Sequence, residues 1–198
     1  MSQSTRERIL VACVARISED GVRRVRISDV AKEAGVSVGL VYYHFTDRAG
    51  LITETLEFVH ELSRDRLVLP AKVGAEDPIL AALLTDIEDR EEVRANSVVW
   101  NEIRAIAVFE DELRASLRQA TDHWQNDIAH DLADTSLHVD EHQAALMLTA
   151  LIEGLSGRWL TGQITEGEAH AVIAEAWNLL RREPATTPPA HPHPTTEE

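Results

Sequence analysis

The chain has few of the residues that would mark a secreted, redox-active or membrane protein. A single cysteine among 198 residues excludes an intramolecular disulfide. No run of about eighteen apolar residues occurs, so the sequence predicts no transmembrane helix, and residues 1–10 lack the apolar segment of a signal peptide. We therefore expect a cytoplasmic protein without a membrane partner. Cys13 lies among apolar neighbours, which favours a buried, inert thiol over a redox sensor.

Motifs of catalysis are also missing. We find no glycine-rich phosphate loop, no HExxH helix of a zinc protease, and no serine or cysteine nucleophile with a matching histidine. The abundant acidic residues follow the pattern of helix surfaces. The sequence therefore predicts that the protein is not an enzyme and holds no cofactor or catalytic metal.

Basic residues are scarce in most of the chain. There are 19 Lys and Arg against 34 Asp and Glu, for a net charge of −15. The negative charge is unevenly distributed along the chain. Residues 1–50 hold eight basic and six acidic side chains, whereas residues 51–198 hold eleven basic and twenty-eight acidic ones. Charges act over about 8 Å at physiological salt, so the basic end can approach DNA while the acidic body is repelled. An acidic surface that only aids solubility explains the body equally well.

Residues 28–51, SDVAKEAGVSVGLVYYHFTDRAGL, have the pattern of a helix–turn–helix. Ser28 is the expected N-cap of the first helix. Gly35 is its expected end, because glycine readily adopts the left-handed conformation found there. Ser37 is the expected N-cap of a two-turn second helix over residues 38–45.

This second helix is too short to bury every side. Val41 and Phe45, four residues apart, share the face that should pack inward. A small rigid helix with exposed side chains can enter a DNA major groove, although each aromatic taken singly also suits a small core. The side chains left to face outward or sideways are Val38, Leu40, Tyr42, Tyr43 and His44.

The stretch GVSVGLVYYHF followed by DRAGL resembles the DNA-binding signature of the TetR family of bacterial transcriptional regulators. Residues 6–35 resemble the first helix of that family and the lead into its second. The resemblance implies a three-helix DNA-binding domain whose third helix reads an operator, and a helical C-terminal domain for dimerisation and effector binding. Val38 departs from the basic residue common at this position in the family, so one phosphate contact is expected to be missing. The residues expected at the DNA interface are Ser28, Ser37, Val38, Gly39, Leu40, Tyr42, Tyr43, His44 and Arg48.

Helical periodicity continues through the rest of the chain. We expect a linking helix that starts at Arg48 and ends before Pro70, and further helices over about 78–89, 91–108, 110–133, 140–161 and 165–182. The predicted fold class is all-α, with about nine helices. The expected domains are a DNA-binding domain at 1–47, an effector-binding and dimerisation domain at 48–183, and a disordered, proline-rich tail at 184–198.

The last two helices interleave large apolar residues with small ones, which lets a partner helix approach closely. Two such helices from each of two subunits would make a four-helix bundle about a twofold axis; a hairpin within one chain is the alternative. Residues 100–114 and 152–165 resemble, more loosely, the C-terminal domain of the BetI-like branch of TetR regulators, which implies the same homodimer. The expected interface residues are Leu148, Ile152, Gly154, Leu155, Trp159, Ile173 and Trp177.

Two further groups of residues suit ligands. Trp100, Arg104, Trp124 and Asp127 combine aromatic walls with polar anchors, as expected of a pocket for a small-molecule effector of unknown identity; packing of the tryptophans in the core is the alternative. A stripe of alternating His and Asp suits either a metal site or a solvent-facing flank. The members of the stripe are His123, Asp127, His130 and Asp134.

Together these features predict a ligand-released, dimeric repressor that binds double-stranded DNA at a near-palindromic operator. The alternative is a helical ligand- or protein-binding module whose DNA-binding half is non-functional. Absence of DNA affinity at low salt would favour the alternative, because contacts with phosphates supply most nonspecific binding.

Overall fold

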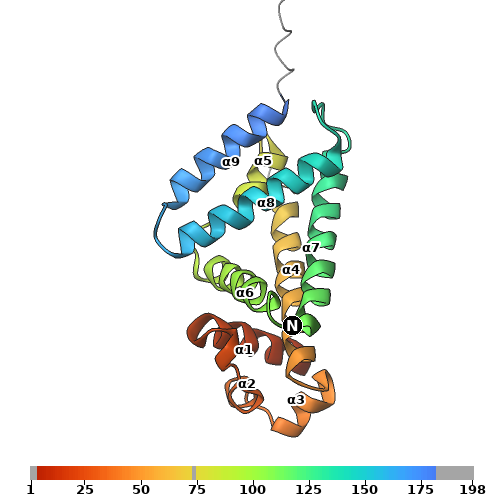
Figure 1. Cartoon of the computed structure of the whole chain (residues 1–198). Coiled ribbons are helices and arrows are strands. Elements are labelled where there is room, and N and C mark those ends of the chain that lie inside the picture. The colour runs from red at the N-terminus through yellow and green to blue at the C-terminus, as the bar shows by residue number, and fades with distance from the viewer. Residues whose placement is uncertain (1–3, 73–74, 182–198) are drawn as a thin grey trace, which may run out of the picture.

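The computed structural model describes residues 4–72 and 75–181, and of residues 65–72 it describes the backbone alone. These ranges contain helices and no strand, which confirms the all-α prediction (Figure 1). No described helix is both long and apolar enough to cross a membrane. In chain order the elements are α1 (Thr5–Asp20), the 3-10 turn η1 (Val22–Arg24), α2 (Ile27–Ala34), α3 (Val38–Phe45), α4 (Arg48–Lys72), α5 (Pro78–Leu84), α6 (Glu91–Ala107), α7 (Asp111–Leu132), α8 (Glu141–Leu160) and α9 (Glu166–Arg181).

Helices α1, α2 and α3 form a compact unit at one end of the molecule (Figure 1). Helix α4 starts in this unit and runs toward the opposite end, alongside α7. Helix α6 packs on α1 and η1 as well as on α8. Helices α5, α8 and α9 occupy the far end. The N-terminal unit is therefore joined to the rest chiefly through α4 and α6.

Side-chain caps set several helix ends. The Ser4 hydroxyl accepts a hydrogen bond from a backbone N–H of the first turn of α1 at 3.1 Å. Asp77 caps α5 in the same way at 3.0 Å, with Pro78 as the first helical residue, where its missing N–H costs nothing. The other carboxylate oxygen of Asp77 accepts from Trp177 Nε1 at 2.8 Å. This cap therefore ties α5 to α9.

Two helix ends differ from the sequence-based expectation. Helix α4 runs through Pro70 to Lys72 rather than ending before the proline; a proline removes one N–H donor and crowds the preceding turn, which weakens a helix without always ending it. Helix α5 stops at Leu84 rather than near residue 89. There the Thr85 hydroxyl donates to the carbonyl of Ala82 at 2.7 Å and competes with the backbone ladder. The predicted tail, 184–198, lies outside the described residues.

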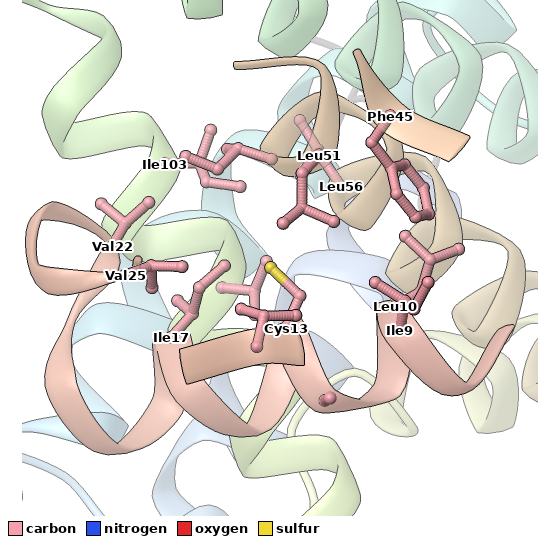
Figure 2. Close-up of a cluster of buried hydrophobic side chains, with 14 of the residues drawn as sticks. Ile9, Leu10, Cys13, Ile17, Val22, Val25, Phe45, Leu51, Leu56 and Ile103 are labelled. Atoms are coloured by element: carbon pink, nitrogen blue, oxygen red, sulfur yellow. The ribbon is translucent and has the colours of Figure 1, made fainter. Parts of the chain in front are cut away.

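The first of two buried clusters holds the N-terminal unit together and extends beyond it (Figure 2). Ile9, Leu10 and Cys13 of α1 pack with Phe45 of α3, and Ile103 of α6 closes the same cluster. It also includes buried residues of the first half of α4. The apolar core thus continues across the predicted domain boundary at residues 47–48, and part of α6 belongs to it.

The second cluster lies between α5, α6, α7, α8 and α9 and contains most of the residues predicted for the dimer interface. Six of the seven expected interface residues are at most 7% exposed within a single chain. A side chain with so little exposed surface has little left to bury against a second subunit, so these six are core residues of the protomer. They are Leu148, Ile152, Leu155, Trp159, Ile173 and Trp177. Gly154 is the exception, since it is exposed and a Cβ added there would meet nothing within 4 Å.

Candidate nucleic-acid interface and ligand cavity

The corner between α2 and α3 has the geometry that the sequence predicts. Gly35 adopts φ 66° and ψ 40°, the left-handed conformation, and Val36 N–H donates to the Ala31 carbonyl at 2.9 Å. The Ser37 hydroxyl accepts from the Leu40 N–H at 3.2 Å and caps α3. These local bonds fix the direction in which α3 leaves the corner.

Helix α3 presents one buried and one exposed side. Val41 and Phe45 are 0% and 3% exposed and anchor the helix in the first cluster, as predicted. Tyr42 is 49% exposed and Tyr43 81%, values that a core aromatic would not have. The other predicted contact residues of this segment are also at least partly exposed. Ser37, Val38 and Gly39 are exposed, and Leu40 and His44 are half-buried.

Ser28 does not cap α2. The helix begins one residue earlier, at Ile27, and its N-cap position is Arg26, whose side chain makes no capping bond. The Ser28 side chain is exposed, with its hydroxyl 3.4 Å from an Asp29 carboxylate oxygen. Ser28 therefore lies within the first turn of α2, where a hydroxyl remains accessible to a phosphate.

Arg48 has a role inside the chain that the resemblance did not imply. Its Nη2 donates to the carbonyl of Val22 at 2.5 Å, and its Nε donates to the carbonyl of Val25 at 3.1 Å. The side chain is half-buried. The guanidinium thus holds the turn that precedes α2, whereas the resemblance implies a contact with the DNA backbone.

Other cations of the N-terminal unit are exposed. Arg24, Arg26 and Lys32 make no ion pair within the described ranges. Arg23 lies with its guanidinium carbon 5.9 Å from the centre of the Phe109 ring. Arg16, in contrast, pairs with Glu19 and Asp20 on its own helix. The charges available to phosphates are therefore concentrated near η1 and α2.

A cavity opens between α4, α6, α7 and α8. Its empty space is about 490 Å³, including solvent at the mouth. Of the four predicted pocket residues, Trp100, Arg104 and Trp124 lie in its wall, and the two indole rings stand 6.1 Å apart at an angle of 40°. The full lining is His60, Ser63, Asp86, Asn96, Ser97, Trp100, Asn101, Arg104, Trp124, Ile152, Glu153 and Ser156.

Polar groups in this wall are mostly paired with each other. Arg104 Nη2 donates to Glu153 at 2.6 Å, and its guanidinium lies 5.9 Å from the Trp100 ring. Asn101 Nδ2 donates to the Ser156 hydroxyl at 3.0 Å. Asn96 differs: it is 5% exposed, and its Nδ2 has no hydrogen-bond partner within the described part of the chain. A buried amide donor without a partner is costly unless water or a ligand completes it.

Asp127, the fourth predicted pocket residue, lies behind the wall. Its Oδ2 is 3.5 Å from His60 Nε2 and 3.4 Å from Arg64 Nε, ion-pair distances without hydrogen-bond geometry. Burial lowers the pKa of His60, against the opposing effect of Asp127 and Glu57. The lowered pKa of His60 favours its neutral form in the cavity wall.

The predicted stripe of His and Asp, which lies on α7 except for Asp134 just beyond its end, does not form one cluster. His123 points to Glu57 of α4, 3.7 Å away, and Asp127 points to His60. His130 and Asp134 are exposed. Among the described residues, no three His, Cys, Asp or Glu side chains are grouped in a way that suits a metal ion.

Sequence reasoning missed most polar residues of the cavity. Asn96 and Ser97 are buried polar residues on a helix whose other inward positions are apolar, and that irregularity was a detectable signal. Asp86 and Glu153 gave no such signal, because their sequence neighbourhoods resemble those of many surface carboxylates. Only the packing of α5, α6 and α8 brings them to one wall.

Comparison with known sequences agrees with this arrangement. Residues 9–55 match the family model of bacterial regulatory proteins of the tetR family, and residues 75–181 match that of the C-terminal part of BetI-type transcriptional repressors. The HTH-type transcriptional regulator ArpR of Pseudomonas putida is 30% identical over 172 residues, which span 80% of this chain and 81% of that protein.

Solved structures show the same fold. A TetR-family transcriptional regulator from Rhodococcus sp. is 37% identical, with a TM-score of 0.83, over 90% of this chain and 98% of that one. A regulator from Saccharomonospora viridis, solved in complex with choline, is 25% identical, with a TM-score of 0.67, over 86% and 93% of the two chains. Sequence, fold and helix–turn–helix therefore agree that the chain belongs to the TetR family of bacterial transcriptional regulators, with a BetI-type C-terminal region.

Proposed function

We propose that the protein is a cytoplasmic, homodimeric repressor that leaves its operator when a small molecule enters the cavity. The exposed side of α3 is the observation that carries the DNA-binding part of this proposal. Val38, Tyr42 and Tyr43 are 41%, 49% and 81% exposed on this helix, and neighbouring exposed apolar side chains mark interaction sites. A major groove accepts one helix of this size and offers both base edges and phosphates.

Contacts with DNA divide by chemistry. Tyr42, Tyr43 and His44 carry groups that hydrogen-bond to base edges or phosphates, and Leu40 suits a thymine methyl group. Val38 supplies no charge on this side of the helix. Arg24, Arg26 and Lys32 supply the salt-sensitive attraction to phosphates, and the acidic body disfavours other orientations.

An apolar face on α8 and α9 supports the dimer. Leu146 and Met147 of α8 are 53% and 50% exposed, and Val172 and Leu179 of α9 are 44% and 51% exposed. Gly154 lies on the same side of α8 as the first two, with open space above its Cα. A second copy packed on this face about a twofold axis would bury these side chains. Such a dimer presents two recognition helices to a near-palindromic operator.

The cavity suits a compact organic ligand. Two indole rings supply apolar walls, and the Arg104–Glu153 pair and Asn96 supply polar contacts. The similar regulator from Saccharomonospora viridis holds choline, and the face of an indole ring attracts an organic cation of that kind. Release from DNA requires that the ligand bind one conformer of the protein more tightly than the other.

Selection of genomic DNA tests the proposal. The purified protein is mixed with fragments of bacterial genomic DNA at low salt, and bound fragments are sequenced and measured again by fluorescence anisotropy. We expect enrichment of a short, near-palindromic site whose affinity falls as salt rises. Absence of both enrichment and low-salt binding would overturn the repressor assignment in favour of a binding module that acts through protein contacts.

A further inference from the structure

Helix α6 meets the ligand cavity on one side and the N-terminal unit on the other. Successive residues of a helix are about 100° apart, so Asn96, Trp100 and Arg104 share one side, which lines the cavity. Glu102 and Ala95 lie on the opposite side. The Ala95 carbonyl accepts from the Ser18 hydroxyl of α1 at 3.3 Å. A single rigid element of 17 residues thus contacts both functional parts of the molecule.

Glu102 makes a specific bond across this boundary. Its Oε2 accepts from the backbone N–H of Val22 at 3.0 Å. Val22 is 1% exposed, and the carboxylate is the hydrogen-bond partner of its N–H. Gly21 permits the approach, because a Cβ there would lie 3.0 Å from Glu102 Oε2 and the residue has φ +78°. The chain therefore leaves space for this carboxylate at a turn whose backbone also requires glycine.

The opposite edge of the same turn is held by α4. Arg48 donates to the carbonyls of Val22 and Val25 at 2.5 Å and 3.1 Å. The turn of residues 22–25 leads directly into α2 and from there to the recognition helix. Beside its packing in the first cluster, the turn thus bonds to one side chain from α6 and one from α4. These are the two helices that connect the N-terminal unit to the body.

We propose that Glu102 is a positioning residue, whose bond to the Val22 N–H sets the placement of the DNA-binding unit on α6. A shift of α6 at the cavity changes the reach of Glu102 to the turn, and the recognition helix moves with the turn. This role rests on the proposed regulator function for its biological meaning, but the placement itself is measurable without DNA or ligand.

Two conservative variants separate a geometric role from an electrostatic one. Glu102→Gln keeps a carbonyl acceptor at the same reach and removes the charge. Glu102→Asp keeps the charge and shortens the side chain by one methylene. Glu112→Asp, the same change at an exposed position of α7, is the matched control.

Pulsed electron paramagnetic resonance measures the placement. Spin labels are attached to Lys32→Cys in α2 and Gln119→Cys in α7, both exposed, and unlabelled protein is added in excess to remove distances between subunits. Cys13 does not interfere, because burial raises the pKa of its thiol to about 11 and hides it from the reagent. Hydrogen exchange of the Val22 amide is followed in the same proteins.

We expect Glu102→Gln and Glu112→Asp to keep the wild-type distance distribution. Glu102→Asp should shift or broaden it. It should also speed exchange at Val22 by about 10- to 150-fold, the range that corresponds to one hydrogen bond to a charged group. An unchanged distribution in Glu102→Asp, or a shift in Glu102→Gln alone, would overturn the proposal. So would an unprotected Val22 amide in the wild-type protein, a result that needs no variant. Failure of the genomic selection would remove the regulator assignment and leave these distances interpretable.

Discussion

Substitution of Arg48 tests whether this residue mainly stabilises the fold or mainly contacts DNA. The resemblance implies a contact with the DNA backbone, whereas the guanidinium is bonded to the carbonyls of Val22 and Val25. Substitution by methionine keeps most of the aliphatic volume and removes both donors. If the bonds within the chain matter, Arg48→Met must destabilise the protein in the absence of DNA.

The magnitude follows from what each carbonyl loses. Both residues are buried, at 1% and 4% exposure, and an unsatisfied buried acceptor costs about 1–3 kcal/mol. The Val22 carbonyl keeps a second partner, the Val25 N–H at 3.3 Å. Its share of the free-energy cost therefore lies at the low end of this range. The expected destabilisation is about 2 kcal/mol, which lowers the melting temperature by about 4–8 °C for a chain of this length.

Circular dichroism during heating gives the melting temperature, and fluorescence anisotropy gives the DNA affinity. Arg24→Met is the matched control, because Arg24 is exposed and without an ion pair in the described ranges; it should lose affinity for DNA at low salt without a change in melting temperature. An Arg48→Met protein that melts with the wild type and loses only DNA affinity would refute the structural role.

Three further outcomes are expected. Tyr42→Ala should abolish retardation of the selected DNA fragment and leave the melting temperature unchanged, since the side chain is 49% exposed; an unchanged retardation would contradict the DNA interface. Gly154→Arg should give monomers in analytical ultracentrifugation with the fold retained, because nothing in the chain lies within 4 Å of the added Cβ; a dimer of normal affinity would exclude this face. Asp77→Asn should destabilise the protein at neutral pH, by an amount that urea unfolding shows to shrink below about pH 4. Burial alone would raise the pKa of Asp77, but hydrogen bonds from Leu80 and Trp177 and the charge of Arg181 lower it. The carboxylate therefore stabilises the fold at neutral pH, and this stabilisation is lost as pH falls through the folded-state pKa. A difference in unfolding free energy between the two proteins that does not change with pH would contradict this.

Local pattern was enough to predict most helices and the helix–turn–helix. Gly35, Ser37, Val41 and Phe45 act within a few residues of one another, through a left-handed turn, a cap and one helical face. Such interactions are encoded in short stretches of sequence, so periodicity and capping rules find them. The all-α class and the exposed side of α3 follow from the same local chemistry.

Residues whose partners lie far along the chain could not be assigned in this way. Arg48 is bonded to a turn 23 to 26 residues away, and Glu102 to one 80 residues away. The predicted interface residues illustrate the same limit: an apolar stripe on α8 indicates that a helix is covered, and only the packing of α5, α7 and α9 shows that the protomer itself covers it. The apolar face of α8 and α9 that stays exposed is the part that this packing does not cover. Sequence periodicity thus determines which sides of each helix are apolar, and the tertiary structure decides what each side meets, because burial depends on contacts between segments far apart in the chain.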